Sequence, residues 1–191
     1  MNPIESRILQ ISKDHNLSHL SSCLNAYPII DDIYQTKRPE DKFVLSAGHC
    51  GLALYAVMES HGIANAEDLL ARHGIHPDLR EKGIDCATGS LGSGLPISLG
   101  IALADSSRDV YCLVSDGELQ EGSCWESLHL KTKFGANNLK VHAVINGFSA
   151  YDSVDREDLE LRLRTFDPLI SIHQVENPAW LAGYAGHYKT L

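Results

Sequence analysis

Apolar residues follow two kinds of spacing along this 191-residue chain. Ile4, Ile8 and Ile11 recur every three to four positions, which is the spacing of one helical face. Other segments are short continuous apolar runs, which are typical of strands buried on both faces of a parallel sheet. The pattern predicts helices at Ile4–Lys13, 28–34, 50–60, 66–72, 97–104, 118–134, 155–164 and 178–188. It predicts strands at 43–46, 109–115, 141–145 and 169–175.

Strands and helices alternate in this prediction. The alternation indicates an α/β fold, with a mainly parallel sheet flanked by helices, and the length suits a single domain over residues 1–191. In such sheets, ligands bind beyond the carboxyl ends of the strands. Two of the predicted strands end at Asp116-Gly117 and Asn146-Gly147, so we expect these polar residues to converge on one point.

Charge and cysteine content exclude several classes of protein. Lys and Arg number 16 against 25 Asp and Glu, so the net charge is −9, which argues against nucleic acid or a membrane surface as a partner. The five cysteines form no C-x-x-C pair, which argues against a disulfide framework or a zinc ribbon and favours a cytoplasmic location. We expect neither a signal peptide nor a membrane span.

The residues after the two strands suggest a magnesium and diphosphate site. Asp116 offers a carboxylate oxygen and Asn146 an amide oxygen, and Mg²⁺ favours such ligands while bridging to substrate phosphates. Gly117 would allow close approach of the backbone, and a helix beginning near Glu118 would present its positive end to an anion. Taken alone, the spacing also fits an Asp helix cap followed by an Asn-Gly turn.

Longer motifs favour the magnesium and diphosphate site over the helix cap and turn. Residues 116–123 read DGELQEGS, precede Trp125-Glu126, and are followed by Asn146; this segment resembles the thiamine-diphosphate motif of transketolases. Residues 41–49 (DKFVLSAGH) and 88–92 (TGSLG) resemble two further segments of that family. Ser18-His19 stands where the family has its S-G-H segment. Four matches in the same order over roughly residues 15–150 form a specific resemblance.

The resemblance implies a thiamine-diphosphate-binding fold that holds thiamine diphosphate and Mg²⁺, and it assigns roles to individual residues. The Mg²⁺ ligands would be the side chains of Asp116 and Asn146 and the carbonyl of Phe148. The catalytic residues would be the channel histidines His19, His49 and His76, with Glu121 and Glu126 at a subunit interface that connects paired cofactor sites. The cofactor contacts would be His49, Gly89, Ser90, Leu91, Gly117, Glu118 and Asn146.

The sequence also departs from the family pattern. Ser115 replaces the first glycine of the family's G-D-G motif, residues 148–152 read FSAYD in place of the usual segment, and 20–22 lack the family's glycines. Only the first of the family's three domains is present, and it is short. The resemblance therefore implies the N-terminal subunit of a two-gene transketolase, shortened at its C-terminus, which pairs with a separate pyrimidine-domain subunit in a heterotetramer. It would transfer a two-carbon ketol unit from a ketose, as a phosphate, to an aldose.

Other interpretations remain open at this stage. The chain could belong to another thiamine-diphosphate enzyme, such as the α-subunit of a 2-oxo acid dehydrogenase or a deoxyxylulose phosphate synthase. The Leu-Gln-Glu-Gly run at 119–122 and the match at Gly48-His49 favour transketolase over both. It could also be a non-catalytic assembly or regulatory partner, or an α/β domain with no cofactor. Retention of Asp116, Gly117 and Asn146 opposes the non-catalytic interpretation.

Overall fold

The central feature of the fold is a four-stranded sheet in which all strands are parallel. The computed structural model describes residues 2–78, 83–149, 152–181 and 188–191. The strands follow the chain order β1-β2-β3-β4, and Val44, Cys112 and Val141 lie side by side in register. Their bounds are β1 (Lys42–Leu45), β2 (Val110–Ser115), β3 (Leu139–Ile145) and β4 (Ser171–Gln174). The expected mainly parallel α/β fold is confirmed, and all carboxyl ends meet at one edge.

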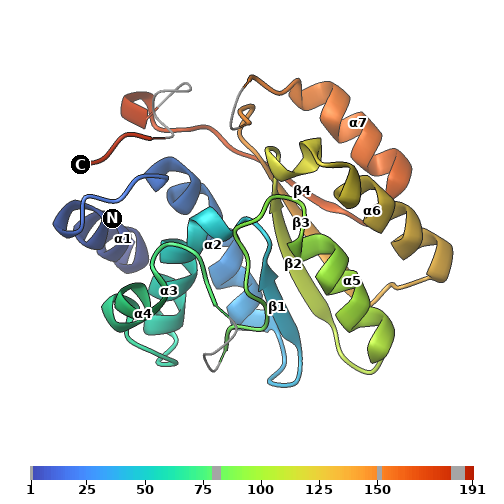
Figure 1. Ribbon diagram of the computed structural model, residues 1–191, viewed down its shortest axis with the longest axis horizontal. Helices are drawn as coiled ribbons and strands as arrows, with labels where there is room; N and C mark the ends of the chain where they lie inside the picture. The colour runs from blue at the N-terminus through green and yellow to red at the C-terminus, as the bar shows by residue number, and fades with distance from the viewer. Residues whose placement is uncertain (1, 79–82, 150–151, 182–187) are drawn as a thin grey trace.

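Helices cover both faces of the sheet (Figure 1). Successive strand side chains point to opposite faces, so Leu45 and Leu113 enter one apolar core while Val44 and Cys112 enter the other. This explains why the strands read as continuous apolar runs. The first core is covered by α1 (Pro3–Asp14), α2 (Leu20–Thr36), α3 (Gly51–Ser60) and α4 (Ala66–His73). The second is covered by α5 (Gly94–Ala104), α6 (Gly122–Phe134) and α7 (Arg156–Phe166).

The second helix begins earlier than the sequence pattern predicts. It starts at Leu20 and contains Pro28 in its interior, although a proline there removes a hydrogen bond and costs about 3 kcal/mol. Leu20, Cys23 and Ile30 are fully buried along this helix. Their burial outweighs the cost of the proline, so the prediction that the helix begins at Pro28 is wrong.

The predicted helix over 118–134 is divided. A short 3₁₀ turn, η2 (Glu118–Gln120), is followed by Glu121 with an extended backbone at φ −85° and ψ 134°, and α6 begins only at Gly122. The division allows the Glu118 side chain to turn into the core, where it is fully buried. The expectation of a helix end beside Gly117 is therefore wrong.

Two smaller elements complete the fold. A second 3₁₀ turn, η1 (Gly48–Cys50), joins β1 to α3. Near the C-terminus, η3 (Ala179–Leu181) begins where a helix over 178–188 was predicted, and residues 182–187 lie outside the described residues. Asn25 in α2 donates a hydrogen bond from Nδ2 to Oδ1 of Asn177 at 2.7 Å, so the segment after β4 returns across the carboxyl edge of the sheet to α2 (Figure 1).

Two further expectations can be compared with the fold. Among the described residues, every helix is too short or too polar to span a bilayer. All five cysteines lie in the described part of the chain, and each is free and buried. They are small core residues, as their apolar neighbours in the sequence indicate.

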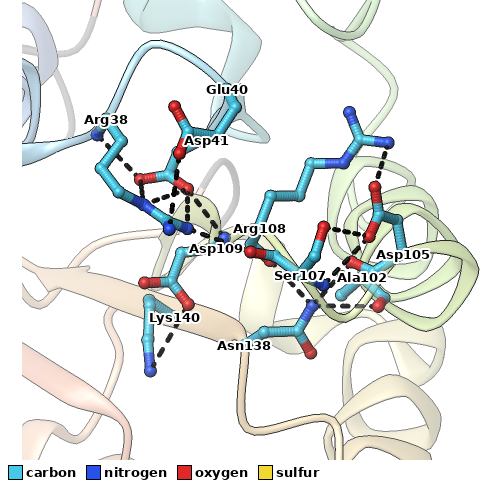
Figure 2. A network of polar contacts seen from close by, with 10 residues as sticks. All are labelled: Arg38, Glu40, Asp41, Ala102, Asp105, Ser107, Arg108, Asp109, Asn138 and Lys140. Atoms are coloured by element: carbon cyan, nitrogen blue, oxygen red, sulfur yellow. Dashed lines mark hydrogen bonds and ion pairs between the residues drawn. The ribbon is translucent and has the colours of Figure 1, made fainter.

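The amino ends of the strands are closed by a polar network (Figure 2). Asp41 precedes β1 and accepts hydrogen bonds from the Arg38 guanidinium at 2.7 Å and from the backbone N–H of Asp109 at 2.9 Å. The Arg38 guanidinium lowers the pKa of Asp41 to about 2. Asn138, just before β3, donates to the carbonyls of Ala102, Asp105 and Arg108. These contacts join β1, β2 and β3 where they begin.

Candidate functional site

A cavity of about 190 Å³ lies at the opposite, carboxyl edge of the sheet. Its walls come from the ends of β1, β2 and β3, from the start of α2, and from the glycine-rich loop before α5. The predicted site residues that line it are His19, His49, His76, Gly89, Leu91, Asp116, Gly117, Asn146 and Phe148. Residues from four separate motifs thus meet in one place, as the parallel topology requires.

Asp116 is the acidic centre of this cavity. Its Oδ2 accepts hydrogen bonds from the backbone N–H groups of Asn146 at 2.8 Å, Gly147 at 2.7 Å and Phe148 at 3.3 Å. Gly147 supports this turn with a φ of +88°, a conformation that favours glycine. A single carboxylate therefore fixes the chain after β3 against the end of β2.

The Asp116 carboxylate is buried without a counter-charge from the chain. Its exposed fraction is 1%, and in the described part of the chain it forms no ion pair with Lys or Arg. Burial raises its pKa, while the backbone N–H donors oppose that rise. A buried carboxylate compensated only by N–H groups is a favourable place for a cation.

The atoms around Asp116 fit a magnesium ion. Oδ1 of Asp116 accepts a hydrogen bond from the Gly117 N–H at 3.1 Å, and Oδ1 of Asn146 accepts one from the Phe148 N–H at 2.9 Å, so each oxygen retains acceptor capacity. With the Phe148 carbonyl as a third ligand they would make an all-oxygen donor set with one negative charge, which suits Mg²⁺. The described residues contain no cluster of three or more His, Cys, Asp or Glu suited to a metal. The donor set therefore relies on amide and carbonyl oxygens.

The glycine-rich loop crosses the end of β1. Thr88 donates from Oγ1 to the Leu45 carbonyl at 2.6 Å, and a Cβ placed on Gly48 would lie 2.6 Å from the Gly89 nitrogen. Gly48 is thus required for the loop to approach this closely. The approach brings Gly89 and the half-exposed Leu91 to the cavity.

The three predicted histidines all line the cavity. The rings of His19 and His49 are 5.3 Å apart between centroids, and a Cβ on Gly89 would meet the His76 ring at 3.0 Å. His19 directly precedes α2 and has a left-handed backbone at φ +62°. Tyr188 also lines the cavity, with its ring 5.7 Å from that of His19.

Comparison with known proteins decides the family. A model described as "Transketolase, thiamine diphosphate binding domain" matches residues 30–160. The chain belongs to this family.

Several relatives cover most of this transketolase-family chain. Transketolase from Pongo abelii is 32% identical, matched over 90% of this chain and 32% of its own length. A protein from Phocaeicola vulgatus, named as one of the subunits of an apulose-4-phosphate transketolase, is 33% identical over 70% of this chain and 54% of its own length. The chain spans about a quarter to a third of the length of the other curated transketolase-related proteins it matches.

Solved structures of the family share the fold. Transketolase from Campylobacter jejuni superposes with a TM-score of 0.75 over 98% of this chain and 39% of its own, at 21% identity. A transketolase mutant from Pichia stipitis, described as a complex with fructose 6-phosphate, gives 0.76 over 93% of this chain and 36% of its own, at 20% identity. These likenesses confirm the thiamine-diphosphate-binding fold.

Four of the residues predicted for the site of this transketolase-family chain do not line the cavity: Ser90, Glu118, Glu121 and Glu126. Ser90 is exposed, and its carbonyl accepts a hydrogen bond from Ser93. Glu121 and Glu126 are exposed near the start of α6. Glu118 is buried behind the cavity wall, and burial raises its pKa to about 7.

The cavity is also lined by residues to which the motif comparison gave no role, among them Ser22, Asn25, Ser149 and Tyr188. Ser22 and Asn25 lie on the early turns of α2, which the proline at 28 concealed. Ser149 lies in the segment that departs from the family pattern. Tyr188 lies well after β4 in the sequence, and no local sequence pattern relates it to the site.

Proposed function

We propose that this chain is the N-terminal, diphosphate-binding subunit of a two-subunit transketolase. In this proposal it is a single cytoplasmic domain over residues 1–191, and it acts with a separate pyrimidine-domain subunit in a heterotetramer. The observation that carries the proposal is the buried Asp116 carboxylate, which pairs with no Lys or Arg of the described residues and lies in the same cavity as Asn146 and Phe148. Membership of the transketolase family gives this arrangement a specific meaning.

Residues at the carboxyl edge would hold the metal and the cofactor. Asp116, Asn146 and the Phe148 carbonyl would hold Mg²⁺, while Gly117 would approach the diphosphate. Gly89 and Leu91 would lie against the remainder of the cofactor. Thiamine diphosphate, when bound, supplies the nucleophilic carbon on which ketol transfer depends.

The histidines would bind and orient the sugar. His19, His49 and His76 all line the cavity, so their ring nitrogens can hydrogen-bond the hydroxyl groups of a ketose or an aldose. These histidines support transfer of a two-carbon ketol unit between sugars, with a ketose phosphate as donor.

Two features support completion of the site by another subunit. The cavity of about 190 Å³ is smaller than the roughly 300–1,000 Å³ of sites that enclose a ligand of cofactor size. In addition, α5 exposes apolar surface, with Ile97 at 43% and Leu103 at 48% exposed. Glu121, just before the neighbouring α6, and Glu126, on that helix, are exposed, and an interface over α5 would place them between subunits. The similarity to a protein named as one of the subunits of a transketolase supports the same arrangement.

Titration calorimetry of thiamine diphosphate with Mg²⁺ tests the proposal. It would be performed on this chain alone and then together with the pyrimidine-domain protein encoded by the neighbouring gene. We expect tight, Mg²⁺-dependent binding in the presence of the partner, followed by ketol transfer activity in a screen of sugar phosphate donors.

The control is the same titration with Asp41→Asn, which alters a buried carboxylate at the far edge of the sheet and should leave binding unchanged. No binding by the wild-type chain in either state would contradict the proposal and favour a non-catalytic role for the fold.

A further inference from the structure

One buried carboxylate connects three walls of the cavity without lining it. Oε1 of Glu118 accepts a hydrogen bond from the Ser46 hydroxyl at 2.7 Å and from the Gly92 N–H at 3.2 Å. Oε2 faces the Ser115 N–H at 3.4 Å. The Glu118 side chain is fully buried, so these contacts are its environment in place of water.

Each partner of Glu118 is next to residues that line the cavity. Ser46 precedes Ala47, Gly92 follows Leu91, and Ser115 itself lines the cavity beside Asp116. The end of β1, the glycine-rich loop and the end of β2 are therefore joined through one side chain. These segments are far apart in the sequence, and the carboxylate is their common contact.

The contact with the loop is held from both sides. The Gly92 N–H donates to Glu118, while the Gly92 carbonyl accepts a hydrogen bond from the Ser123 hydroxyl at 2.8 Å. A Cβ on Gly92 would lie 2.6 Å from Cβ of Glu121 and from Oγ of Ser123. The segment after Asp116 thus holds the peptide units on both sides of Gly92, which fixes the position of Leu91.

We infer that Glu118 is a positioning residue. Its carboxylate oxygens accept hydrogen bonds from the glycine-rich loop and from the ends of β1 and β2, and these bonds hold the loop in place beside the cavity. This assignment replaces the expected role of Glu118 as a cofactor contact. Its consequence for binding rests on the proposed function: the Asp116 side of the cavity would hold the diphosphate, and the loop would hold the rest of the cofactor.

Amide hydrogen exchange on the full chain tests the positioning role directly. Glu118→Ala should accelerate exchange over residues 88–93 by about tenfold, because a buried hydrogen bond to a charged group is lost. Glu118→Gln retains an acceptor oxygen and should restore exchange to near the wild-type rate. Asp41→Asn, a buried carboxylate remote from the loop, should not change the rate in this segment selectively.

The binding measurement separates the two sides of the cavity. With Mg²⁺ present, Glu118→Ala should weaken binding of thiamine diphosphate about tenfold. The same variant should leave binding of inorganic pyrophosphate within about twofold of wild type, because pyrophosphate does not reach the loop. Glu118→Gln should recover most of the affinity for thiamine diphosphate.

Several outcomes would overturn the inference. Unchanged exchange over 88–93 in Glu118→Ala, or failure of Glu118→Gln to restore it, would show that the carboxylate does not position the loop. Equal losses for the two ligands would show that Glu118 acts on the whole site. If the wild type binds neither ligand even with the pyrimidine-domain subunit present, the proposed function fails, while the exchange experiment still decides the role of Glu118.

A second variant keeps the test available if Glu118→Ala does not fold. Ser46→Ala removes the shortest hydrogen bond to Glu118, and the Ser46 hydroxyl does not itself bond to the loop. We expect faster exchange over 88–93, by less than in Glu118→Ala. Unchanged exchange in Ser46→Ala would contradict transmission through Glu118.

Discussion

Two buried aspartates at opposite edges of the same sheet have opposite electrostatic environments. Asp41 at the amino edge and Asp116 at the carboxyl edge are 3% and 1% exposed, and both accept several backbone N–H donors. Arg38 accompanies Asp41 and lowers its pKa to about 2. Asp116 has no such partner in the described chain, and burial raises its pKa.

The difference shows where the chain satisfies its own charges and where it does not. At the amino edge, the guanidinium and the backbone donors offset the burial of the carboxylate, so the network stabilises the fold. At the carboxyl edge, the compensation that the described residues give to the charge comes from N–H groups, and the chain gives up stability there. A local loss of stability of this kind is characteristic of sites that must accept a ligand.

The largest expected effect is that of an Asp-to-Asn substitution at the carboxyl edge. Asp116→Asn removes the charge that would hold Mg²⁺, and we expect Mg²⁺-dependent binding of thiamine diphosphate to fall by at least about 100-fold, because a metal supplies several kcal/mol of charge stabilisation. Without Mg²⁺, the variant should melt no lower than wild type, since it no longer buries an uncompensated charge. Calorimetry and thermal melts measure the two effects.

Both measurements are needed for Asp116→Asn. Intact Mg²⁺-dependent binding would exclude Asp116 as the metal ligand. A large fall in melting temperature without Mg²⁺ would instead show that Asp116 is structural, as Asp41 is.

At the amino edge, the matched substitution should lower stability without affecting binding. Asp41→Asn loses the interaction with Arg38, whose side chain is half-exposed and so is not left buried, and we expect a loss of about 1–3 kcal/mol at neutral pH. Urea unfolding of wild type and variant measures the difference.

The effect of Asp41→Asn should also depend on pH in a defined direction. The pKa of Asp41 is about 2 in the folded chain against 3.8 for the ordinary side chain, so its contribution is complete above about pH 4 and is lost as the pH falls toward 2. A difference between wild type and variant that stays constant over this interval would contradict the assigned role of the ion pair.

The contrast between the two edges was only partly accessible from the sequence. Parallel strands ending at Asp116 and Asn146 predicted their convergence, because the carboxyl ends of such strands share an edge. The motifs added the histidines and the loop. The pattern gave no indication that Glu118 turns inward, since DGEL reads equally well as the first turn of a helix. The early start of α2 depended on burial of Leu20 and Cys23, which tertiary packing decides and local preference does not.

Two glycines sharpen the comparison at the level of the backbone. Gly92 at the carboxyl edge and Gly135, which ends α6 before β3, have similar left-handed φ values of +73° and +64°. A Cβ on Gly92 would collide with Glu121 and Ser123 at 2.6 Å, whereas one on Gly135 would meet nothing within 4 Å. The backbone conformation therefore disfavours a Cβ at both positions, but only at Gly92 would that Cβ also be crowded by neighbouring side chains.

The last predicted effect is the difference between these two substitutions. Gly135→Ala should cost about 1 kcal/mol, because the left-handed conformation disfavours any residue with a Cβ. Gly92→Ala should cost about 1–3 kcal/mol more, because the loop must also move away from the segment that follows Asp116. Urea unfolding gives both costs. Equal losses would show that the loop shifts freely at Gly92, so the hydrogen bonds of Glu118 and Ser123 to Gly92 would not hold the cavity in shape. A larger loss in Gly92→Ala, with binding of pyrophosphate retained, would show that the carboxyl edge keeps its loop in place by close packing against the same segment that carries the unpaired charge.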